Sequence, residues 1–500
     1  MTLRQAVLAL ASAIILSAVV GFSFPGDDLS LIIPRVLQME DPGLFTNDIY
    51  FNKPAQSYEL VAFMASQLSK IRALPVSLAV VMIITHLILV VSVWRAASYI
   101  LKGPVSFAIV LFVMILAGPR MMGGIITGNS YHPQFTSYAL FVLALSFIIE
   151  MRLYTALFIM ALSAVFHPLI GLYGLLFVAL GALSKKVSIK EKLKLAAMAV
   201  IVLFIVIVPS IKSGGVDLTA KLWKEYVNIL LYIRAPHHHL PYVWSVVDIF
   251  RSVIIIIAGL LLAIRTRGFI LTAFILSLAL CLIGIVNNIS IQIPKVVIAY
   301  PARMAQVILF LFWALMAAFL DQAVRRLATV RMRRIVLAAA LGMVFIFVAL
   351  SKFPDNISLS SEKDPSWIGV CYAAEKNIDK DSAVIIPPDK CDFQYLSKRS
   401  AFVTAKHFPF HPMRAIEWVK RMSYLHLVIL PDDISRIKDR LDIDGAMYKK
   451  ITEADVDAIH KLYPFVRYCI VDKEEPLPFR KLYENRRYSL YAITPPKGAS

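Results

Sequence analysis

Repeated apolar runs of nearly membrane-spanning length constrain the fold of this chain more than any other feature of its sequence. A helix that crosses a bilayer needs about 20 apolar residues, and hydropathy predicts about eleven such segments within residues 1–351. Their centres are expected near Ala13, Ile84, Val110, Leu143, Ile159, Leu176, Phe204, Ile256, Ser277, Phe312 and Gly342. Hydrophobic residues make up 59% of the chain and its mean hydropathy is +0.71. The sequence therefore predicts a polytopic α-helical membrane protein.

The chain changes character at about residue 352. Charged residues become frequent, and apolar runs shorten to strand length, at 383–387, 401–404 and 425–430. Helix-like segments alternate with these runs, at 367–376, 413–422, 434–441 and 453–462. This alternation predicts a small α/β domain with a largely parallel sheet. We therefore expect a transmembrane domain over residues 1–351 and a soluble α/β domain over residues 352–500.

The distribution of charge between alternate loops predicts the orientation. One set of loops holds 16 Lys and Arg residues against three Asp and Glu residues, which accounts for +13 of the formal net charge of +19. Because Lys and Arg are enriched in cytoplasmic loops, we expect this set and the N-terminus in the cytoplasm. The first external loop (22–75), the second large external loop (212–251) and the α/β domain then lie on the extracytoplasmic side of the cell membrane. The basic composition needs no nucleic-acid partner.

Motifs for nucleotide chemistry are absent from the sequence. It contains no Gly-rich phosphate loop, no Walker motif and no Cys pair with zinc spacing, so we expect no nucleotide cofactor and no ATP-driven transport. Four cysteines are too few for a disulfide scaffold. One bridge, between Cys371 and Cys391, is expected only if the compartment is oxidising.

Two adjacent acids, Asp27 and Asp28, follow the first apolar run after a short polar step. Carboxylates at a membrane face are costly to hold there and usually have a function. They can take a proton from a hydroxyl as a general base, or ligate Mg²⁺ or Mn²⁺ through hard oxygens. Asp48, further along the same loop, is a second candidate acid. The alternative is that Asp27 only caps the following helix.

A basic and imidazole-rich segment, 232–242, contains Arg234, His237 and His238 within the second large loop. An Arg fork beside imidazoles suits a phosphate or pyrophosphate, because several charge-assisted donors can converge on its oxygens. A metal site is the competing use, although adjacent histidines rarely point to one centre. The other alternative is a loop whose histidines contact only water or lipid headgroups.

Three further residues stand at the outer ends of predicted spans. His132 and His167 each precede a proline, and this repetition predicts that both line one polar cavity. Each alone could equally be a histidine that bonds a helix end. Arg303 opens the tenth predicted span from the outside, where a cation can bind a lipid phosphate headgroup.

This layout resembles the GT-C-type membrane glycosyltransferases, which use polyprenyl-phosphate-linked sugars. The resemblance covers the whole chain: an acidic first external loop, many short-looped helices and a soluble outer domain at the C-terminus. Sharper motif matches connect the chain to a bacterial family of uncharacterised multi-pass proteins. These matches are the Asp27-Asp28 loop, the segments Phe166–Gly171 and Arg234–His238, and the tail segment from Pro387 to Arg421.

The superfamily resemblance implies a catalytic role for the first-loop acids. Asp27 or Asp28 would serve as catalytic base or metal ligand, and the acceptor hydroxyl would attack the anomeric carbon. The lipid phosphate would leave against Arg234, His237 and Arg303. The implied function is sugar transfer from a polyprenyl-phosphate donor to a glycan, lipid or cell-surface acceptor, with membrane lipids as further partners.

Two other classes of function stay open. The chain lacks the Trp-Trp-Asp triplet of oligosaccharyltransferases, so protein N-glycosylation is not expected. A transporter or flippase of a lipid-linked glycan would use the same cationic cavity without chemistry. A non-catalytic partner in a polysaccharide-assembly complex would use the C-terminal domain for docking.

Overall fold

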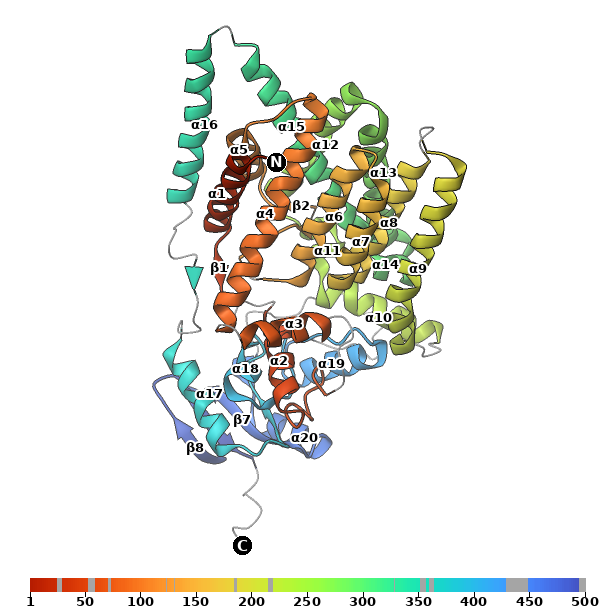
Figure 1. The fold of residues 1–500 in the computed structure, drawn as a ribbon. Coiled ribbons are helices and arrows are strands. Elements are labelled where there is room, and N and C mark those ends of the chain that lie inside the picture. The colour runs from red at the N-terminus through yellow and green to blue at the C-terminus, as the bar shows by residue number, and fades with distance from the viewer. Residues whose placement is uncertain are drawn as a thin grey trace. The chain divides into compact units, whose positions relative to one another are not determined.

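The chain divides into two compact units, each assembled from three separate stretches of sequence. Unit 1 comprises Met1–Ser23, Val76–Ser213 and His237–Ser358, and unit 2 comprises Phe24–Pro75, Gly214–Pro236 and Leu359–Ser500. Their elements can be followed in Figure 1, a computed structural model. The structure describes residues 1–24, 29–52, 59–70, 73–122, 124–129, 131–183, 187–214, 219–327, 329–350, 357–358, 364–428 and 448–493.

Unit 1 is helical. Its longer helices are α1 (Leu3–Val20), α4 (Leu74–Leu101), α5 (Phe107–Ala117), α6 (Pro133–Ile149), α7 (Leu153–Phe166), α8 (Pro168–Ala182), α9 (Ile189–Gly214), α12 (Val246–Thr266), α13 (Gly268–Val286), α15 (Ala305–Arg325) and α16 (Val330–Leu350). Each predicted segment centre falls inside one of these helices. Apolar runs form helices in apolar surroundings because a helix pairs its backbone N–H and C=O groups within itself.

Five helices in the described part of the chain are long and apolar enough to cross a membrane: Leu3–Val20, Leu74–Leu101, Val246–Thr266, Gly268–Ile291 and Pro294–Arg325. Helices α5 to α8 are apolar but shorter, with 10–17 residues. The predicted helical, membrane-compatible character is thus confirmed. The expectation of about eleven spans stays a prediction, because the shorter helices fall below the usual spanning length.

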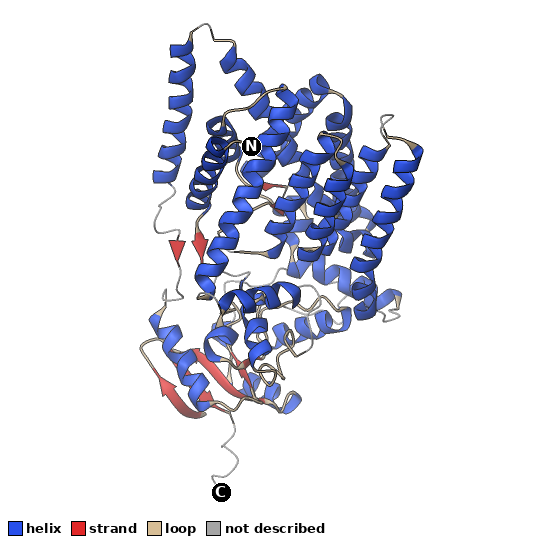
Figure 2. Cartoon of the chain, viewed as in Figure 1, coloured by secondary structure: helices blue, strands red, loops and turns tan. Residues whose placement is uncertain are grey.

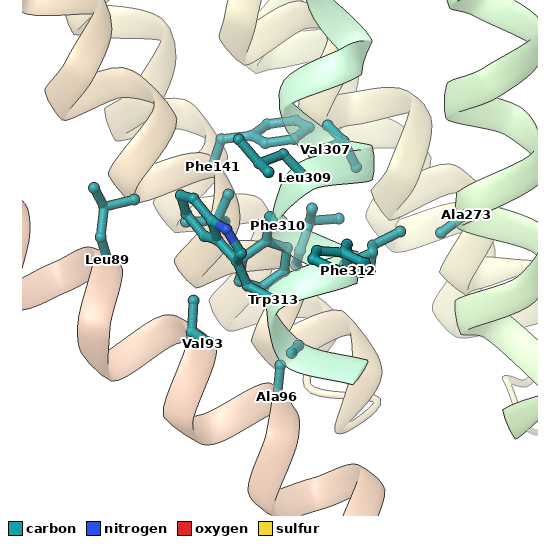
Figure 3. Packing of buried hydrophobic residues seen from close by; sticks show 14 of the residues in the cluster. Leu89, Val93, Ala96, Phe141, Ala273, Val307, Leu309, Phe310, Phe312 and Trp313 are labelled. Atoms are coloured by element: carbon teal, nitrogen blue, oxygen red, sulfur yellow. The ribbon is translucent and has the colours of Figure 1, made fainter. Parts of the chain in front are cut away.

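Helix α15 lies at the centre of the hydrophobic core of unit 1. Phe310 and Trp313 are at most 1% exposed. Figure 3 shows Leu89 and Val93 of α4 on one side of α15 and Ala273 of α13 on the other. A helix buried on every side explains why this segment of the sequence is apolar all round.

Short elements connect the helices of unit 1. They are α11 (Pro236–His239), α14 (Pro294–Ala299), the 3-10 helices η3 (Pro241–Val243) and η5 (Pro301–Met304), and the π-helix η4 (Asn287–Ile291). Strand β1 (Phe22–Ser23) pairs in parallel with β4 (Ile357–Ser358), and β2 (Arg120–Met121) pairs antiparallel with β3 (Gly124–Ile125). Arg303 of η5 and His239 of α11, together with Tyr300 between α14 and η5, belong to the candidate site described below.

Unit 2 contains a five-stranded sheet in the order β6-β5-β7-β9-β8. Its strands are β5 (Ala383–Ile385), β6 (Ser400–Ala401), β7 (Val466–Asp472), β8 (Arg480–Glu484) and β9 (Tyr488–Ala492). Strands β6, β5 and β7 are parallel, whereas β9 runs antiparallel to both β7 and β8. The predicted largely parallel sheet is therefore wrong for its C-terminal half. Figure 2 shows the sheet and its helices by type.

Helices from all three stretches of sequence belong to unit 2. They are η1 (Leu29–Leu31), α2 (Ile33–Glu40), α3 (Glu59–Ser69), α10 (Ala220–Asn228), the π-helix η2 (Ile229–Arg234), α17 (Pro365–Asn377), α18 (Phe393–Ser397), α19 (Pro412–Tyr424), η7 (Tyr448–Lys450) and α20 (Glu453–Leu462). Three predicted tail helices are confirmed as α17, α19 and α20. The predicted helix 434–441 lies outside the described residues, and the described part of the predicted strand 425–430 forms turns.

The cysteine bridge considered from the sequence is not formed in this structure. The Cys391 thiol donates to the carbonyl of Pro388 at 3.7 Å, and the Cys371 thiol is buried in α17. Cys371 packs in the hydrophobic core between α17 and the sheet, together with Val370 and Val384. Burial raises the pKa of the Cys371 thiol well above its ordinary value.

Candidate functional site

Arg303 is a cation in unit 1 that has no ion-pair partner among the described residues. It belongs to η5, at the start of α15. Three other arginines of this unit do have a carboxylate partner: Arg95 with Glu150 at 2.6 Å, Arg251 with Asp248 at 2.7 Å, and Arg325 with Asp321 at 2.6 Å. A guanidinium without a carboxylate partner among apolar helices makes Arg303 a candidate for binding an anion.

An unusual backbone presents Arg303. Tyr300 has a positive φ of 48°, a left-handed conformation that is uncommon for a residue with a large side chain. Pro301 follows and starts η5. On the facing helix α13, a Cβ on Gly284 would lie 2.8 Å from the backbone nitrogen of Ala302. The glycine therefore lets α13 approach the segment that carries Arg303.

His167 receives a hydrogen bond from Arg303. The Arg303 Nη1 donates to His167 Nε2 at 2.8 Å. His167 is at once the last cap of α7 and the first cap of α8. The two helices pack closely there, because a Cβ on Gly171 would lie 2.3 Å from the Cβ of Ala164. The local structure thus explains two residues of the segment Phe166–Gly171. Pro168 starts α8, and Gly171 permits the close packing of α8 against α7.

His132 occupies the corresponding place on α6. It caps the helix, and its Nδ1 accepts a hydrogen bond from the backbone N–H of Gln134 at 3.1 Å. His132 also interacts electrostatically with His167. The structure therefore brings together the two His-Pro pairs that the sequence analysis singled out.

The histidines of α11 surround Tyr300. The His239 ring lies 4.5 Å from the Tyr300 ring and the His238 ring 6.0 Å, between ring centroids. Tyr300 also donates its hydroxyl hydrogen to the His238 carbonyl. His239 is 7% exposed and its Nδ1 pairs with Asn288 Nδ2 at 3.1 Å. His237 stacks on His238 at 4.0 Å.

Tyrosines complete the surroundings of Arg303. The Arg303 guanidinium carbon lies 5.1 Å from the centroid of the Tyr300 ring, a cation–π contact. Arg303 also interacts electrostatically with Tyr138, Tyr173 and His239. Tyr173 uses its hydroxyl to bond the carbonyl of Ala299 at 2.9 Å, which holds α8 to α14.

We call this group the Arg303 cluster. It consists of Arg303, His132, His167, His239, Tyr138, Tyr173 and Tyr300. Its members are a cation, imidazoles and hydroxyls, which can donate hydrogen bonds to an anion. The cluster contains no carboxylate, so its donors do not suit Mg²⁺ or Mn²⁺, which prefer carboxylate and carbonyl oxygens. The described residues also contain no group of three His, Cys, Asp or Glu that could hold a metal ion.

Arg234 belongs to unit 2, at the end of η2. Its Nη2 donates to the carbonyl of Lys406 at 3.4 Å, and its guanidinium lies 5.8 Å from the centroid of the Phe408 ring. His237 and His238 belong to unit 1. Residues that are close in the sequence motif are thus divided between the two units.

Asp48 is buried in unit 2, with 1% of its surface exposed. Its Oδ1 accepts from the backbone N–H groups of Tyr50 and Phe51, at 2.9 and 3.1 Å. Its Oδ2 accepts from Gln394 Nε2 at 3.0 Å and from the Ala401 N–H at 3.3 Å. Burial raises the pKa of Asp48, against the effect of these donors. Because both oxygens are occupied, we assign Asp48 to the fold of unit 2 and leave it out of the proposed site.

His407 continues this network to Ser30, in the stretch Phe24–Pro75 of unit 2. Its Nδ1 accepts from Gln394 Nε2 at 3.0 Å, and its Nε2 donates to the Ser30 carbonyl at 3.1 Å. Its ring stacks on Tyr50, with 5.6 Å between ring centroids. Burial lowers the pKa of His407 to about 3. The neutral imidazole thus links the stretch Phe24–Pro75 to the C-terminal part of unit 2.

Asp27 and Asp28 lie outside the described residues. The described residues on either side of them are both bound within unit 2. Phe24 contacts Tyr395 edge to face, with 5.9 Å between ring centroids, and Ser30 accepts the hydrogen bond from His407. Both ends of the segment that carries the two acids therefore contact the C-terminal part of the chain.

Sequence reasoning missed His239 and the tyrosines of the Arg303 cluster. His239 adjoins the two histidines that were predicted, but only the structure shows which of the three is buried. The pairing of Arg303 with His167 spans 136 positions and leaves no local pattern. The one local signal was Tyr300 directly before Pro301, because an X-Pro step often marks a constrained turn.

Comparison with known proteins assigns a description to one part of the chain. A family model described as "Domain of unknown function (DUF6798)" matches residues 365–425. This segment runs from α17 to the end of α19 and includes Gln394 and His407. No curated protein matches the chain.

Proposed function

We propose that this chain is a GT-C-type membrane glycosyltransferase. It would move a sugar from a polyprenyl-phosphate carrier to a glycan, lipid or cell-surface acceptor. The observation that carries the proposal is Arg303, a guanidinium with no ion-pair partner among the described residues, in a unit built of apolar helices. A lipid-linked phosphate supplies both the negative charge and the apolar tail that such a site requires.

The proposed reaction begins at the first-loop acids. The carboxylate of Asp27 or Asp28 takes the proton of the acceptor hydroxyl. The hydroxyl oxygen then bonds to the anomeric carbon while the bond from that carbon to the phosphate oxygen breaks. The electron pair of the broken bond stays on the phosphate oxygen, where Arg303 stabilises the developing negative charge. His237 and His238 are the further residues of unit 1 that we propose to contact this phosphate.

The proposed orientation places this chemistry outside the cell membrane. The N-terminus would be cytoplasmic, and the C-terminal residues of unit 2 would be extracytoplasmic. The support is the excess of 16 basic over three acidic residues in the loops assigned to the cytoplasm. A donor activated by its lipid phosphate needs no nucleotide on that side.

Sugar transfer by the purified protein tests the proposal. The protein in nanodiscs is incubated with a panel of polyprenyl-phosphate sugars, with and without Mg²⁺ or Mn²⁺. We expect Asp27→Asn or Asp28→Asn to abolish transfer, and Arg303→Gln to lower kcat by about 10²-fold, the usual cost of a lost charge-stabilising donor. Asp41→Asn and Arg120→Gln are matched controls, because both native side chains are accessible to solvent.

The outcomes separate the proposed enzyme from its rivals. Transfer that one of the two acid substitutions abolishes, with both controls active, supports the enzyme and identifies its base. Binding of the lipid-linked sugar without turnover would overturn the proposal in favour of a transporter or flippase. Absence of both binding and transfer would favour a non-catalytic partner of a polysaccharide-assembly complex.

A further inference from the structure

A polar cavity of about 760 Å³ lies in unit 2, where strand β7 ends and helix α17 begins. Its lining consists of charged and hydroxyl side chains: Ser366, Asp472, Lys473, Glu474, Arg486 and Arg487. Asp472 is the last residue of β7, and β7 runs parallel to β5, as β6 does. Ligands of open α/β sheets commonly bind beyond the carboxyl ends of parallel strands. The cavity therefore occupies the place in this fold where a ligand site is expected.

Two hydrogen bonds hold the walls of the cavity together. Asn485, in the turn between β8 and β9, donates from its Nδ2 to the Ser366 carbonyl at 2.6 Å and joins this turn to the start of α17. The Lys473 N–H donates to the Arg487 carbonyl at 2.7 Å and joins the end of β7 to the same turn. The Arg487 guanidinium carbon lies 5.2 Å from the centroid of the Tyr488 ring. The protein's own contacts thus form the cavity in advance, as is usual for a binding site.

Several charges at the cavity have partners within unit 2. Arg487 pairs with Asp364 at 3.3 Å, and its Nε lies 3.9 Å from Asp472. Lys473 pairs with Glu484 at 3.1 Å. These side chains hold the walls in place, and their ion pairs reduce what they can offer to a ligand.

Glu474 and Arg486 differ from these residues. Both line the cavity, but neither side chain forms an ion pair or a hydrogen bond with any residue that the structure describes. Glu474 offers carboxylate oxygens that accept hydrogen bonds, and Arg486 offers a planar fork of donors with a positive charge. A ligand that uses both residues must present hydrogen-bond donors to one of them and a negative group to the other.

The lining indicates the chemical class of this ligand. Among the described residues that line the cavity, none has an apolar side chain, so a lipid gains little by entering it. A polyphosphate would place repeated negative charge against Asp472 and Glu474. Sugar hydroxyls both donate and accept hydrogen bonds, so they can pair with carboxylates and with guanidinium groups. A carboxylate on the sugar can in addition pair with the fork of Arg486.

We infer that this cavity binds an acidic saccharide, with sugar hydroxyls on Glu474 and a sugar carboxylate on Arg486. The inference rests on the proposed function, whose acceptor classes include a glycan, and narrows that acceptor to a carboxylated one. The lining contains three cations against two carboxylates, which favours an acidic saccharide over a neutral one. A zwitterionic peptide also carries both charges, but this lining gives its side chains no apolar contact.

Equilibrium binding to the full-length protein in nanodiscs tests the inference. The first probe is a tetrasaccharide that contains glucuronic acid, and the second is the same tetrasaccharide after reduction of its carboxylates to alcohols. Tetraglycine is the third probe, a zwitterion without side chains. We expect the carboxylated probe to bind at least about tenfold more tightly than either of the others, the scale of one charge-assisted hydrogen bond. The measurements are made at about 150 mM salt, which screens the overall charge of the protein.

The substitution Arg486→Gln tests the assigned contact. We expect it to weaken binding of the carboxylated probe about tenfold, and to change binding of the reduced probe by less than about twofold. Lys461→Gln is the matched control, because it removes the same charge from an exposed position of α20, outside the lining. This control should leave the binding of both saccharides within about twofold of the wild type. Thermal unfolding confirms that both variants are folded.

The outcomes bear separately on this inference and on the proposed function. Equal binding of the two saccharides, binding of tetraglycine as tight as that of the carboxylated probe, or an equal loss in Arg486→Gln and Lys461→Gln would overturn the inference. Selective binding that depends on Arg486, without any sugar transfer, would support the inference and overturn the proposed enzyme activity. Sugar transfer to a neutral acceptor, without selective binding of the carboxylated probe, would overturn the inference and support the enzyme.

Discussion

At the scale of single residues, Asp48 connects parts of the chain that are far apart in sequence. Its Oδ2 accepts from the N–H of Ala401, 353 positions away. We predict that Asp48→Asn lowers the free energy of unfolding by about 1–3 kcal/mol, because the new amide group cannot accept from all four donors. Chemical unfolding of the purified protein measures this difference.

Asp41 provides the matched control for that substitution. Its side chain is 43% exposed and forms a surface ion pair with Lys380 at 2.7 Å. Because surface ion pairs stabilise little, Asp41→Asn is expected to change the free energy of unfolding by less than about 1 kcal/mol. Similar losses for the two variants would contradict the role assigned to Asp48.

Because His407 is buried as a neutral imidazole, we predict that the free energy of unfolding depends on pH. Its pKa is about 3 in the folded protein, against an ordinary value of 6.5. Below pH 6.5 the unfolded chain binds a proton that the folded protein does not bind until about pH 3. The stabilisation by neutral His407 is thus complete above pH 6.5 and falls as the pH falls, by about 2 kcal/mol between pH 6.5 and 5.

The variant His407→Phe separates the pH dependence caused by His407 from the pH dependence caused by Asp48. The raised pKa of Asp48 acts in the opposite direction, because the folded protein then binds that proton at a higher pH than the unfolded chain. His407→Phe keeps an aromatic ring beside Tyr50 and removes the titrating group. We expect unfolding curves of this variant to lose less stability than the wild type between pH 6.5 and 5. An unchanged pH slope would contradict the assignment.

Sequence reasoning identified polar residues at this scale but not their partners. It selected Arg303, His132 and His167, because polar side chains in apolar segments are costly and therefore informative. It also selected Asp48, whose burial among backbone donors could not be foreseen. A hydrogen bond between residues hundreds of positions apart has no local sequence signal.

At the scale of elements, the close approach of α13 to η5 depends on Gly284. A Cβ there would lie 2.8 Å from the Ala302 nitrogen, so Gly284→Ala must displace the segment that carries Arg303. We predict a loss of about 1–3 kcal/mol in the free energy of unfolding, the usual cost of overpacking. Weaker binding of the polyprenyl-phosphate sugars used in the transfer assay should accompany this loss.

Gly342 on α16 is the control for the glycine substitution. A Cβ at this position meets nothing within 4 Å. Gly342→Ala should therefore be neutral or stabilise the helix by up to about 1 kcal/mol. Equal effects of Gly284→Ala and Gly342→Ala on thermal unfolding and on binding of the polyprenyl-phosphate sugars would argue against a special role for the α13 contact.

The helices were predictable and half of the sheet was not. Hydropathy located the apolar helices, because each is a long continuous run. The parallel strands followed from alternation with helices, but β8 and β9 form a hairpin joined by residues 485–487. Asn485 bonds the N–H groups of Arg487 and Tyr488 through its side chain, a turn signal that the prediction did not use.

At the scale of the whole molecule, unit 2 needs sequence from outside the tail. We predict that residues 352–500 alone are less stable than the same residues fused to 24–75, by about 2 kcal/mol or more in the free energy of unfolding. In the shorter fragment Gln394 loses Asp48, and His407 loses Ser30. Urea unfolding of the two fragments measures the difference.

A second fusion tests whether the buried network is the cause. The fusion that carries Asp48→Asn should recover only part of the added stability, because its contacts with Gln394 and Ala401 are weakened. Equal stability of the tail alone and the intact fusion would contradict the prediction. The sequence did not reveal this dependence, because composition places a boundary at residue 352 but says nothing about which distant loop completes the core.

The alternation of the two units along the chain has a consequence for biosynthesis. The polypeptide passes between unit 1 and unit 2 five times, and the last strand of unit 2 ends at Ala492. The segment 24–75 leaves the ribosome hundreds of residues before Gln394 and His407, so Asp48 and Ser30 lack these partners until the tail has been synthesised. A chain truncated before residue 394 never acquires these partners for Asp48 and Ser30. Only a chain synthesised beyond His407 can therefore complete the buried network of unit 2.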